Sequence, residues 1–173
     1  MPSGGPVATI VTADMAREVR SLTEIYVDGD ACPVRDEIYR VAERLGLAVL
    51  VVSNGSRPLR PPRQGNVRMV LVGQGADAAD DWIAERITAA DVCVTADIPL
   101  AARCLAGGAR AVSPAGKHWT GDNIGQALAG REIARHLRET GIGSGGPPPL
   151  TRADRSRFLG ALDAAVQAAR RAK

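Results

Sequence analysis

The stretch EIYVDGDACPVRDEIYRVAERLGLAVLVVSNG, residues 24–55, decides the fold. It holds two apolar runs, at 25–27 and 47–52, on either side of a segment whose apolar residues recur at helical spacing. Pro33 stands where a first helical residue is expected, and Gly46 stands where the helix would end. The pattern predicts a strand, a helix and a second strand. Both strands are apolar along their length, which is typical of strands buried on both faces.

The same alternation continues to the end of the chain. Further strands are expected at 67–72, 92–94 and 111–112, and helices at 78–88, from Pro99 to Gly107, at 123–139 and from Thr151. This order predicts an α/β fold with three α/β/α layers around a mainly parallel sheet of about five strands. Residues 1–23 are expected to be a disordered extension. Residues 24–173 are expected to form a single domain, with a helical appendage after the Gly/Pro-rich loop 141–149.

The amino-acid composition excludes several kinds of functional site. Three cysteines and two histidines are too few for a disulfide framework or for a zinc site of the usual Cys/His kind. Aromatic residues make up 3% of the chain, too little for a base-stacking platform of the RNA-recognition-motif kind. No apolar run approaches the roughly 20 residues that span a bilayer. We therefore expect a cytoplasmic protein without a membrane partner, whose chemistry uses carboxylates and a phosphate-bearing ligand.

Several carboxylates follow the expected strands. Asp28 and Asp30 end the first strand, Asp97 follows the strand at 92–94, and Asp80 and Asp81 begin a helix. Ligands of open parallel sheets bind beyond the carboxyl ends of the strands. Carboxylates gathered there repel one another unless a cation or protons intervene, and oxygen-rich clusters suit Mg²⁺ or Mn²⁺. Asp30 as a helix cap and Asp80 as a partner of a helix dipole are the structural alternatives.

A second enzyme class fits part of this pattern. A strand followed by Asp-x-Asp, with Ser53 after the next strand, resembles phosphatases of the haloacid-dehalogenase type. In such an enzyme Asp28 would form an aspartyl-phosphate and Asp30 would act as the acid/base. That family next requires a lysine followed by an acidic metal-binding motif. Here the two lysines, Lys117 and Lys173, both come after the acidic cluster, so the phosphatase is the alternative hypothesis.

Longer motifs resemble the YaiI/YqxD family of uncharacterised bacterial proteins. They are DGDACPV (28–34), DAADDWI (77–83), DVCVTADIPLA (91–101), SPAG (113–116) and GGP (145–147). They occur in the family's order from about Ile25 to the last helix. The second position of the first motif, often alanine in relatives, is Gly29 here, and this leaves the carboxylates unchanged.

The resemblance carries functional implications. The family is regarded as PIN-like, and the Thr-Ala-Asp ending at Asp97 resembles the pattern of PIN nucleases. By that resemblance Asp28 and Asp97 bind Mg²⁺ or Mn²⁺, Asp80 or Asp81 supplies a helix-borne acid, and Asp30 assists. The implied reaction is metal-assisted hydrolysis of a phosphodiester, with RNA as the expected substrate. PIN-like folds also include inactive members, so a catalytically silent nucleic-acid-binding or regulatory module is the third hypothesis.

A nucleic-acid substrate needs contacts to its backbone. Arg57, Arg60 and Arg63 lie in a proline-rich loop after the second expected strand, and Lys117 follows the fifth. We expect these four cations to lie near the same sheet edge as the acids and to contact phosphate groups. A solvated loop is the alternative for the three arginines.

Overall fold

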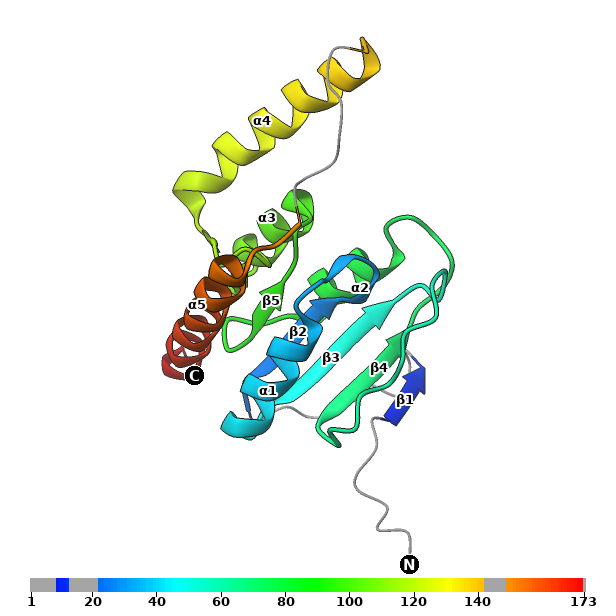
Figure 1. The fold of residues 1–173 in the computed structure, drawn as a ribbon, viewed down its shortest axis with the longest axis vertical. Helices are drawn as coiled ribbons and strands as arrows, with labels where there is room; N and C mark the ends of the chain where they lie inside the picture. The colour runs from blue at the N-terminus through cyan, green and yellow to red at the C-terminus, as the bar shows by residue number, and fades with distance from the viewer. Residues whose placement is uncertain (1–8, 13–21, 142–148, 173) are drawn as a thin grey trace, which may run out of the picture.

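The computed structural model describes residues 9–12, 22–141 and 149–172 of the chain. Its centre is a seven-stranded sheet with the order β1-β4-β3-β2-β5-β6-β7 (Figure 1). The strands are β1 (Thr9–Thr12), β2 (Glu24–Asp28), β3 (Ala48–Ser53), β4 (Val67–Leu71), β5 (Val92–Val94), β6 (Arg110–Val112) and β7 (His118–Trp119). Neighbouring strands are parallel except for β6 and β7, which pair antiparallel.

Helices cover both faces of the sheet. They are α1 (Arg35–Leu45), α2 (Ala78–Arg86), α3 (Ile98–Ala106), α4 (Gly121–Glu139) and α5 (Arg152–Arg171), with a short 3₁₀ turn, η2 (Gly29–Ala31). Helices α1 and α5 pack with one set of strand residues, and α2 and α3 pack with the other. The α/β class, the three layers and the mainly parallel sheet expected from the sequence are confirmed.

Strand alternation explains the two cores. Ile25 and Val27 of β2 face α1 and α5, whereas Tyr26, between them, faces α2 and α3. On the α1 side, Phe158 and Leu162 of α5 are completely buried. Fully burying one such side chain contributes about 1.5–3 kcal/mol, so α5 is an integral part of the core.

The end of α1 follows its sequence signal, but its start does not. Gly46 has the left-handed φ of 68° and closes the helix by donating its N–H to backbone carbonyls, as glycine at this position commonly does. The helix begins at Arg35, and its N-cap, Val34, makes no side-chain cap hydrogen bond. Asp30 instead accepts a hydrogen bond from Ser53, so its role as a helix cap, one of two alternatives above, is wrong.

The sheet reaches into the segment that we expected to be a disordered extension. Thr9–Thr12 forms β1 and pairs in parallel with β4, from Thr9 beside Arg68 to Thr12 beside Leu71. The expectation for residues 1–23 is therefore wrong at 9–12. Residues 1–8 and 13–21, like most of the expected loop at 141–149, lie outside the described part of the chain.

Helix α4 stands apart from the sheet. It has 19 residues, none of them buried; it contacts α3 and extends away from the sheet (Figure 1). It begins with a capping box in which Thr120 accepts from the N–H of Asn123 and Asn123 accepts from the N–H of Thr120. Within the described residues, none of the helices is long and apolar enough to cross a membrane.

The strand order creates a topological switch point. From β2 the chain proceeds outward through β3 and β4 on one side, and then returns to the other side of β2 to form β5 and β6. Residues Ile25–Val27 of β2 pair with Val92–Val94 of β5. Open α/β sheets bind ligands in the crevice outside the carboxyl ends of the strands at such a point. The candidate site is therefore expected where β2 and β5 end.

Candidate active site

Asp28 is the last residue of β2 and lies at the switch point. It is 8% exposed. Burial is the largest influence on the pKa of its carboxyl group and raises it, the charges of Asp30 and Asp97 raise it further, and hydrogen bonding to the N–H of Asp30 and the hydroxyl of Thr95 lowers it. A buried carboxylate with two other acids nearby is costly to ionise unless a positive charge accompanies it.

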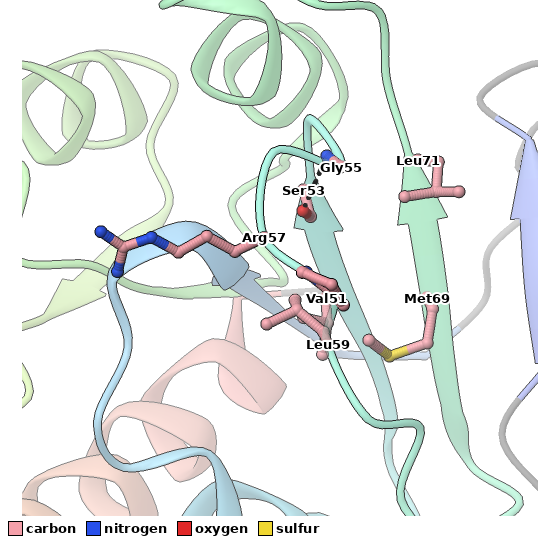
Figure 2. Close-up of a pocket in the computed structure, with 8 residues that line it drawn as sticks. Val51, Ser53, Gly55, Arg57, Leu59, Met69 and Leu71 are labelled. Carbon is pink, nitrogen blue, oxygen red and sulfur yellow. Dashed lines mark hydrogen bonds between the residues drawn. The ribbon is translucent and has the colours of Figure 1, made fainter.

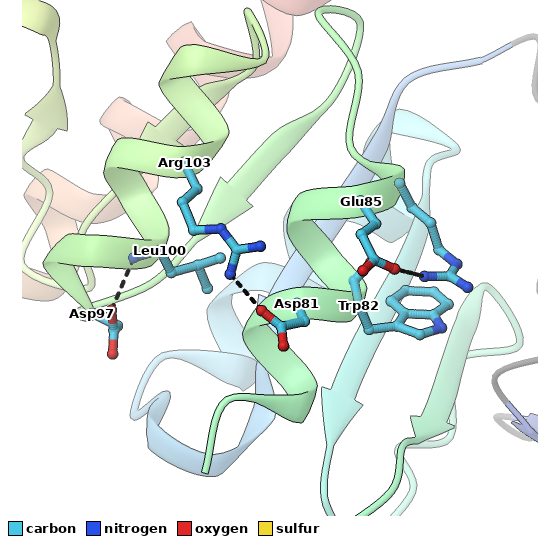
Figure 3. A network of polar contacts seen from close by, with 7 residues as sticks. Asp81, Trp82, Glu85, Asp97, Leu100 and Arg103 are labelled. Carbon is cyan, nitrogen blue, oxygen red and sulfur yellow. Dashed lines mark hydrogen bonds and ion pairs between the residues drawn. The ribbon is translucent and has the colours of Figure 1, made fainter. Parts of the chain in front are cut away.

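Asp97 leaves the neighbouring strand. It follows β5 by way of Thr95, whose hydroxyl is fully buried and accepts a 2.9 Å hydrogen bond from the N–H of Asp97. One oxygen of Asp97 accepts from the N–H of Leu100 at 2.9 Å and so caps the N-terminus of α3 (Figure 3). The second oxygen has no hydrogen-bond partner among the described residues. Thr95 thus connects the two acids that the sequence singled out.

Asp80 comes from α2 and completes the acidic cluster. Its pKa is raised to about 7 by burial, by the charges of Asp97, Asp28 and Asp77, and is lowered somewhat by Arg103. Because charges influence one another strongly only at short range, the structure brings Asp28, Asp80 and Asp97 together. We call these three residues the acidic cluster.

Asp81 does not join the acidic cluster. It turns toward α3, where one carboxylate oxygen lies 2.7 Å from an Nη atom of Arg103 (Figure 3). Both side chains are about half exposed, so this pair contributes at most about 1 kcal/mol to stability. Of the two neighbouring candidates from the helix, Asp80 faces the strand ends and Asp81 links α2 to α3.

The helical periodicity of the sequence distinguishes Asp80 from Asp81. Ala79, Trp82 and Ile83 are the buried residues of α2 and define its inward face. Successive residues are rotated by about 100° around a helix, which puts Asp80 on the flank of that face and Asp81 nearly opposite.

The carboxylates suit a magnesium or manganese ion that is also held by water and substrate, but not one held by protein side chains alone. Within the described residues, no group of three or more His, Cys, Asp or Glu side chains is arranged so that it could hold a metal ion. The set expected above, Asp28, Asp80, Asp81 and Asp97, is therefore not assembled as a ready-made cage. Mg²⁺ keeps several waters and is usually held by one or two carboxylates together with substrate phosphates. The carboxylates at the ends of β2 and β5 match that kind of site.

Asp30 lies between the acidic cluster and β3. Its carboxylate accepts from the hydroxyl of Ser53 at 2.9 Å and from the N–H of Asn54 at 3.4 Å. The Ser53 hydroxyl also accepts from the N–H of Gly55, at 3.1 Å. Asp30 is close enough to Asp28 to raise its pKa. It is oriented by the carboxyl end of β3, a relationship that the sequence pattern did not predict.

The three loop arginines spread along the connection between β3 and β4. Each is exposed or largely so, and none has a hydrogen bond or an ion pair within the described part of the chain. Arg57 lines a pocket together with Ser53, at the carboxyl end of β3. Arg63 instead lines a different pocket, together with Asp36 and Tyr39 of α1. The structure therefore brings Arg57, rather than the whole set, beside the acid-bearing edge.

Lys117 lies in the turn between β6 and β7. Its backbone N–H donates to Ser113 Oγ at 3.0 Å, and its ammonium lies 5.0 Å from the centre of the Trp119 ring. It is exposed, and the described residues give it no ion pair. A phosphatase of the haloacid-dehalogenase type needs a lysine beside its aspartates, and the described residues give Lys117 no contact with them.

The cysteines offer no nucleophile to this site. Cys32, the nearest in sequence to Asp28, is buried, and burial raises the pKa of its thiol to about 11. Cys93 and Cys104 are fully buried, and a hydrogen bond between them, with burial, raises the pKa of Cys93. Thiolates are the reactive form, so the thiols of Cys32 and Cys93 are inert at neutral pH.

The fold and the acidic cluster together define an α/β protein with carboxylates at the switch point of a parallel sheet. The sequence profile described as "Uncharacterized BCR, YaiI/YqxD family" matches residues 26–168, and the chain belongs to this family. The resemblance found in its motifs is thereby confirmed.

Relatives match over nearly their whole length. The UPF0178 protein of Paramagnetospirillum magneticum is 53% identical over 150 residues, which cover 87% of this chain and 98% of that protein. The UPF0178 protein of Parvibaculum lavamentivorans is 54% identical over 150 residues, 87% of this chain and 97% of its own. That of Mesorhizobium japonicum is 55% identical over 139 residues, 80% and 88% of the two chains. No solved structure matches the chain, and the PIN-like relationship stays a prediction.

Proposed function

We propose that this chain is a divalent-metal-dependent phosphodiesterase that cleaves single-stranded RNA. The observation that carries the proposal is the pairing of β2 with β5, because it joins Asp28 and Asp97 at the switch point of the sheet. Asp80 adds a third carboxylate from α2, and its pKa of about 7 reflects first its burial and then the repulsion by the other acids of the cluster. A cation between Asp28 and Asp97 would relieve that repulsion.

Each residue near the acidic cluster would have a separate role in this reaction. Asp28 and Asp97 would hold Mg²⁺ or Mn²⁺ through their carboxylate oxygens. When bound, such an ion lowers the pKa of a coordinated water and stabilises negative charge on a phosphate. The Thr95 hydroxyl would favour the ionised form of Asp28, since it lowers the pKa of that carboxyl group, and Ser53 orients Asp30 through its hydrogen bond. Arg57, exposed at the same edge, provides a guanidinium for the phosphate backbone.

Metal binding tests the first half of the proposal. The melting temperature would be measured at pH 8 with and without Mn²⁺ or Mg²⁺, because a ligand that binds the native state stabilises it in proportion to its saturation. Asp28→Asn and Asp97→Ser should lose the shift. Serine at position 97 can still cap α3, so this variant removes the charge and keeps the helix start. Asp81→Asn is the matched control and should keep the shift.

Cleavage tests the second half. End-labelled single-stranded RNA would be incubated with Mn²⁺ and wild type, Asp28→Asn, Asp97→Ser or Asp81→Asn. Cleavage by wild type and Asp81→Asn alone supports the proposal, whereas equal cleavage by all four proteins indicates a contaminant and sinks it. Turnover of a phosphomonoester with a trapped phosphorylated Asp28 would favour the phosphatase. Metal-dependent RNA binding without cleavage would favour the non-catalytic module.

A further inference from the structure

A pocket opens on the sheet beside Asp30, on the face that α1 and α5 cover elsewhere. Its volume is about 290 Å³, at the lower end of the roughly 300–1,000 Å³ of small-molecule sites. Val51 of β3, Met69 and Leu71 of β4 and Leu59 of the loop form its apolar lining, and Arg57 also lines it, with its guanidinium directed away from these side chains (Figure 2). A pocket of this size suits one ring system of a ligand rather than a whole large molecule.

The connection between β3 and β4 creates this pocket. Parallel strands need a crossover, which in α/β proteins is usually a helix packed on the sheet. Here residues 54–66 return without helix or strand, so only a loop covers this corner of the sheet. Leu71 of β4 is consequently 48% exposed, whereas Val67, Met69 and Val70 of the same strand are buried.

The pocket and the acidic cluster meet at one point. Ser53 lines the pocket, and its hydroxyl donates to Asp30, which lies next to Asp28. Gly29 lets the two come close. A Cβ at Gly29 would lie 2.8 Å from Val51 Cγ1 and 3.0 Å from Leu59 Cδ1, two atoms of the pocket lining. The turn that carries the acids therefore packs directly on the side chains that form the pocket.

We propose that this pocket receives one base of the RNA strand whose backbone phosphate lies at the acidic cluster. This inference rests on the proposed function and adds the recognition of a base to it. Arg57, which has no ion pair or hydrogen bond within the described residues, contacts the phosphate. The apolar lining matches the ring face of a base, and the Arg57 guanidinium, which extends away from that lining, is available for the anionic phosphate of the same strand.

Aliphatic side chains can serve this purpose. Bases bound outside a duplex stack between aromatic or apolar side chains, and methionine adapts to flat ligands because it is flexible and polarizable. The scarcity of aromatic residues excludes a stacking platform but not a single slot of this kind. Ser53 already donates to Asp30 and accepts from Gly55, so its hydroxyl is not free to read the edge of a base. The slot is therefore tolerant of base identity.

Binding without catalysis tests the pocket. The affinity of the full chain would be measured in EDTA by fluorescence anisotropy for hexauridylate and for the same ribose–phosphate backbone with hydrogen in place of each base. Wild type should bind hexauridylate about tenfold more tightly than the abasic oligomer, in keeping with the strength of base stacking. Leu71→Ser should abolish most of this ratio. Ile133→Ser, which changes a 63% exposed residue on α4, is the matched control and should preserve it.

Arg57→Gln separates the phosphate contact from the base contact. It should weaken the binding of both oligomers by a similar factor. It should also lower by about one the number of counterions released on binding, as measured from the dependence of affinity on salt concentration. A wild-type protein that binds both oligomers equally would overturn the pocket assignment, as would a Leu71→Ser variant with an unchanged ratio.

The two proposals fail in different ways. Manganese-dependent cleavage of RNA without a base-dependent affinity would leave the proposed function standing and remove the pocket from it. A base-dependent affinity that Leu71→Ser abolishes, with no cleavage under any metal condition, would leave the pocket as an RNA site and remove the enzymatic activity.

Discussion

The backbone N–H of Asp97 donates a 2.9 Å hydrogen bond to the buried hydroxyl of Thr95. The same hydroxyl also lowers the pKa of Asp28, at the end of the adjacent strand, so one side chain influences both acids. Threonine suits this position because its methyl group packs in a strand while its hydroxyl both donates and accepts.

Thr95→Val is expected to destabilise the protein by about 1–3 kcal/mol, because it leaves the Asp97 N–H without its partner and removes a hydroxyl that favours the ionised Asp28. Thr95→Ser keeps the hydroxyl and is the control. Urea unfolding at pH 7 measures both variants. The hydrogen bond from Thr95 lowers the pKa of Asp28, so the valine variant should also shift the acid limb of any phosphodiesterase pH profile upward. Equal stability of the valine and serine variants would contradict this account.

Asp80→Asn is expected to stabilise the metal-free protein at pH 8 but not near pH 4. The folded-state pKa of about 7 lies above that of an unfolded aspartate, so the native state binds the extra proton between these values. The contribution of Asp80 is therefore complete below about pH 4 and is lost as the pH rises through about 7. Unfolding in EDTA across this range measures the difference. Asp81→Asn, which alters only an exposed ion pair, should show little pH dependence of this kind.

Gly116→Ala is expected to destabilise the protein by about 2–5 kcal/mol, since it combines overpacking with left-handed backbone strain. Its φ is 89°, and a Cβ there would lie 2.8 Å from the backbone C of Arg157 and N of Phe158, in α5. Gly46→Ala is the matched control because Gly46 also has a positive φ but has nothing within 4 Å of its Cβ position. That variant should lose only about 1–2 kcal/mol. Similar losses in thermal unfolding would mean that the turn does not pack against α5.

Gly29→Ala is expected to cost about 1–3 kcal/mol, because its Cβ would lie within 3.0 Å of Leu59 Cδ1 and of the Val52 carbonyl oxygen. Leu59→Ala removes one of these obstacles. In a double-mutant cycle the two substitutions should therefore couple favourably by about 0.5 kcal/mol or more. Additive effects on the free energy of unfolding would show that Leu59 does not resist the added methyl group.

Much of the fold could be predicted because each signal was local. The apolar strands ending in Asp28 and near Asp97 lie where the alternation indicated, and the helix expected from Thr151 is α5, which begins with a capping box between Thr151 and Asp154. The position of Asp28 and Asp97 at one edge of the sheet could be predicted, because the strands were expected to be parallel. The adjacency of β2 and β5 could not be predicted, because strand order depends on long-range pairing that periodicity does not encode.

The parts that the sequence did not predict depend on tertiary contacts. Strand β1 is four residues long, too short for its pattern to stand out from an irregular segment. The partner of Asp30 is Ser53, which lies on a neighbouring strand rather than on the following helix. The pocket arises from a missing crossover helix, and its lining comes from two strands and a loop, so no single motif marks it.

Strand β1 has a further consequence, for the solubility of the chain. It occupies the outer edge of β4, whose backbone would otherwise expose free N–H and C=O groups beside the half-exposed Leu71. An open, apolar edge of this kind is a template for pairing with another chain. Removing residues 1–12 would uncover it, and the shortened protein would form aggregates at concentrations at which the full chain remains dispersed. Strand β1 therefore protects the edge of the sheet from pairing with other chains, and this role is separate from any role of the acids at the carboxyl end of β2.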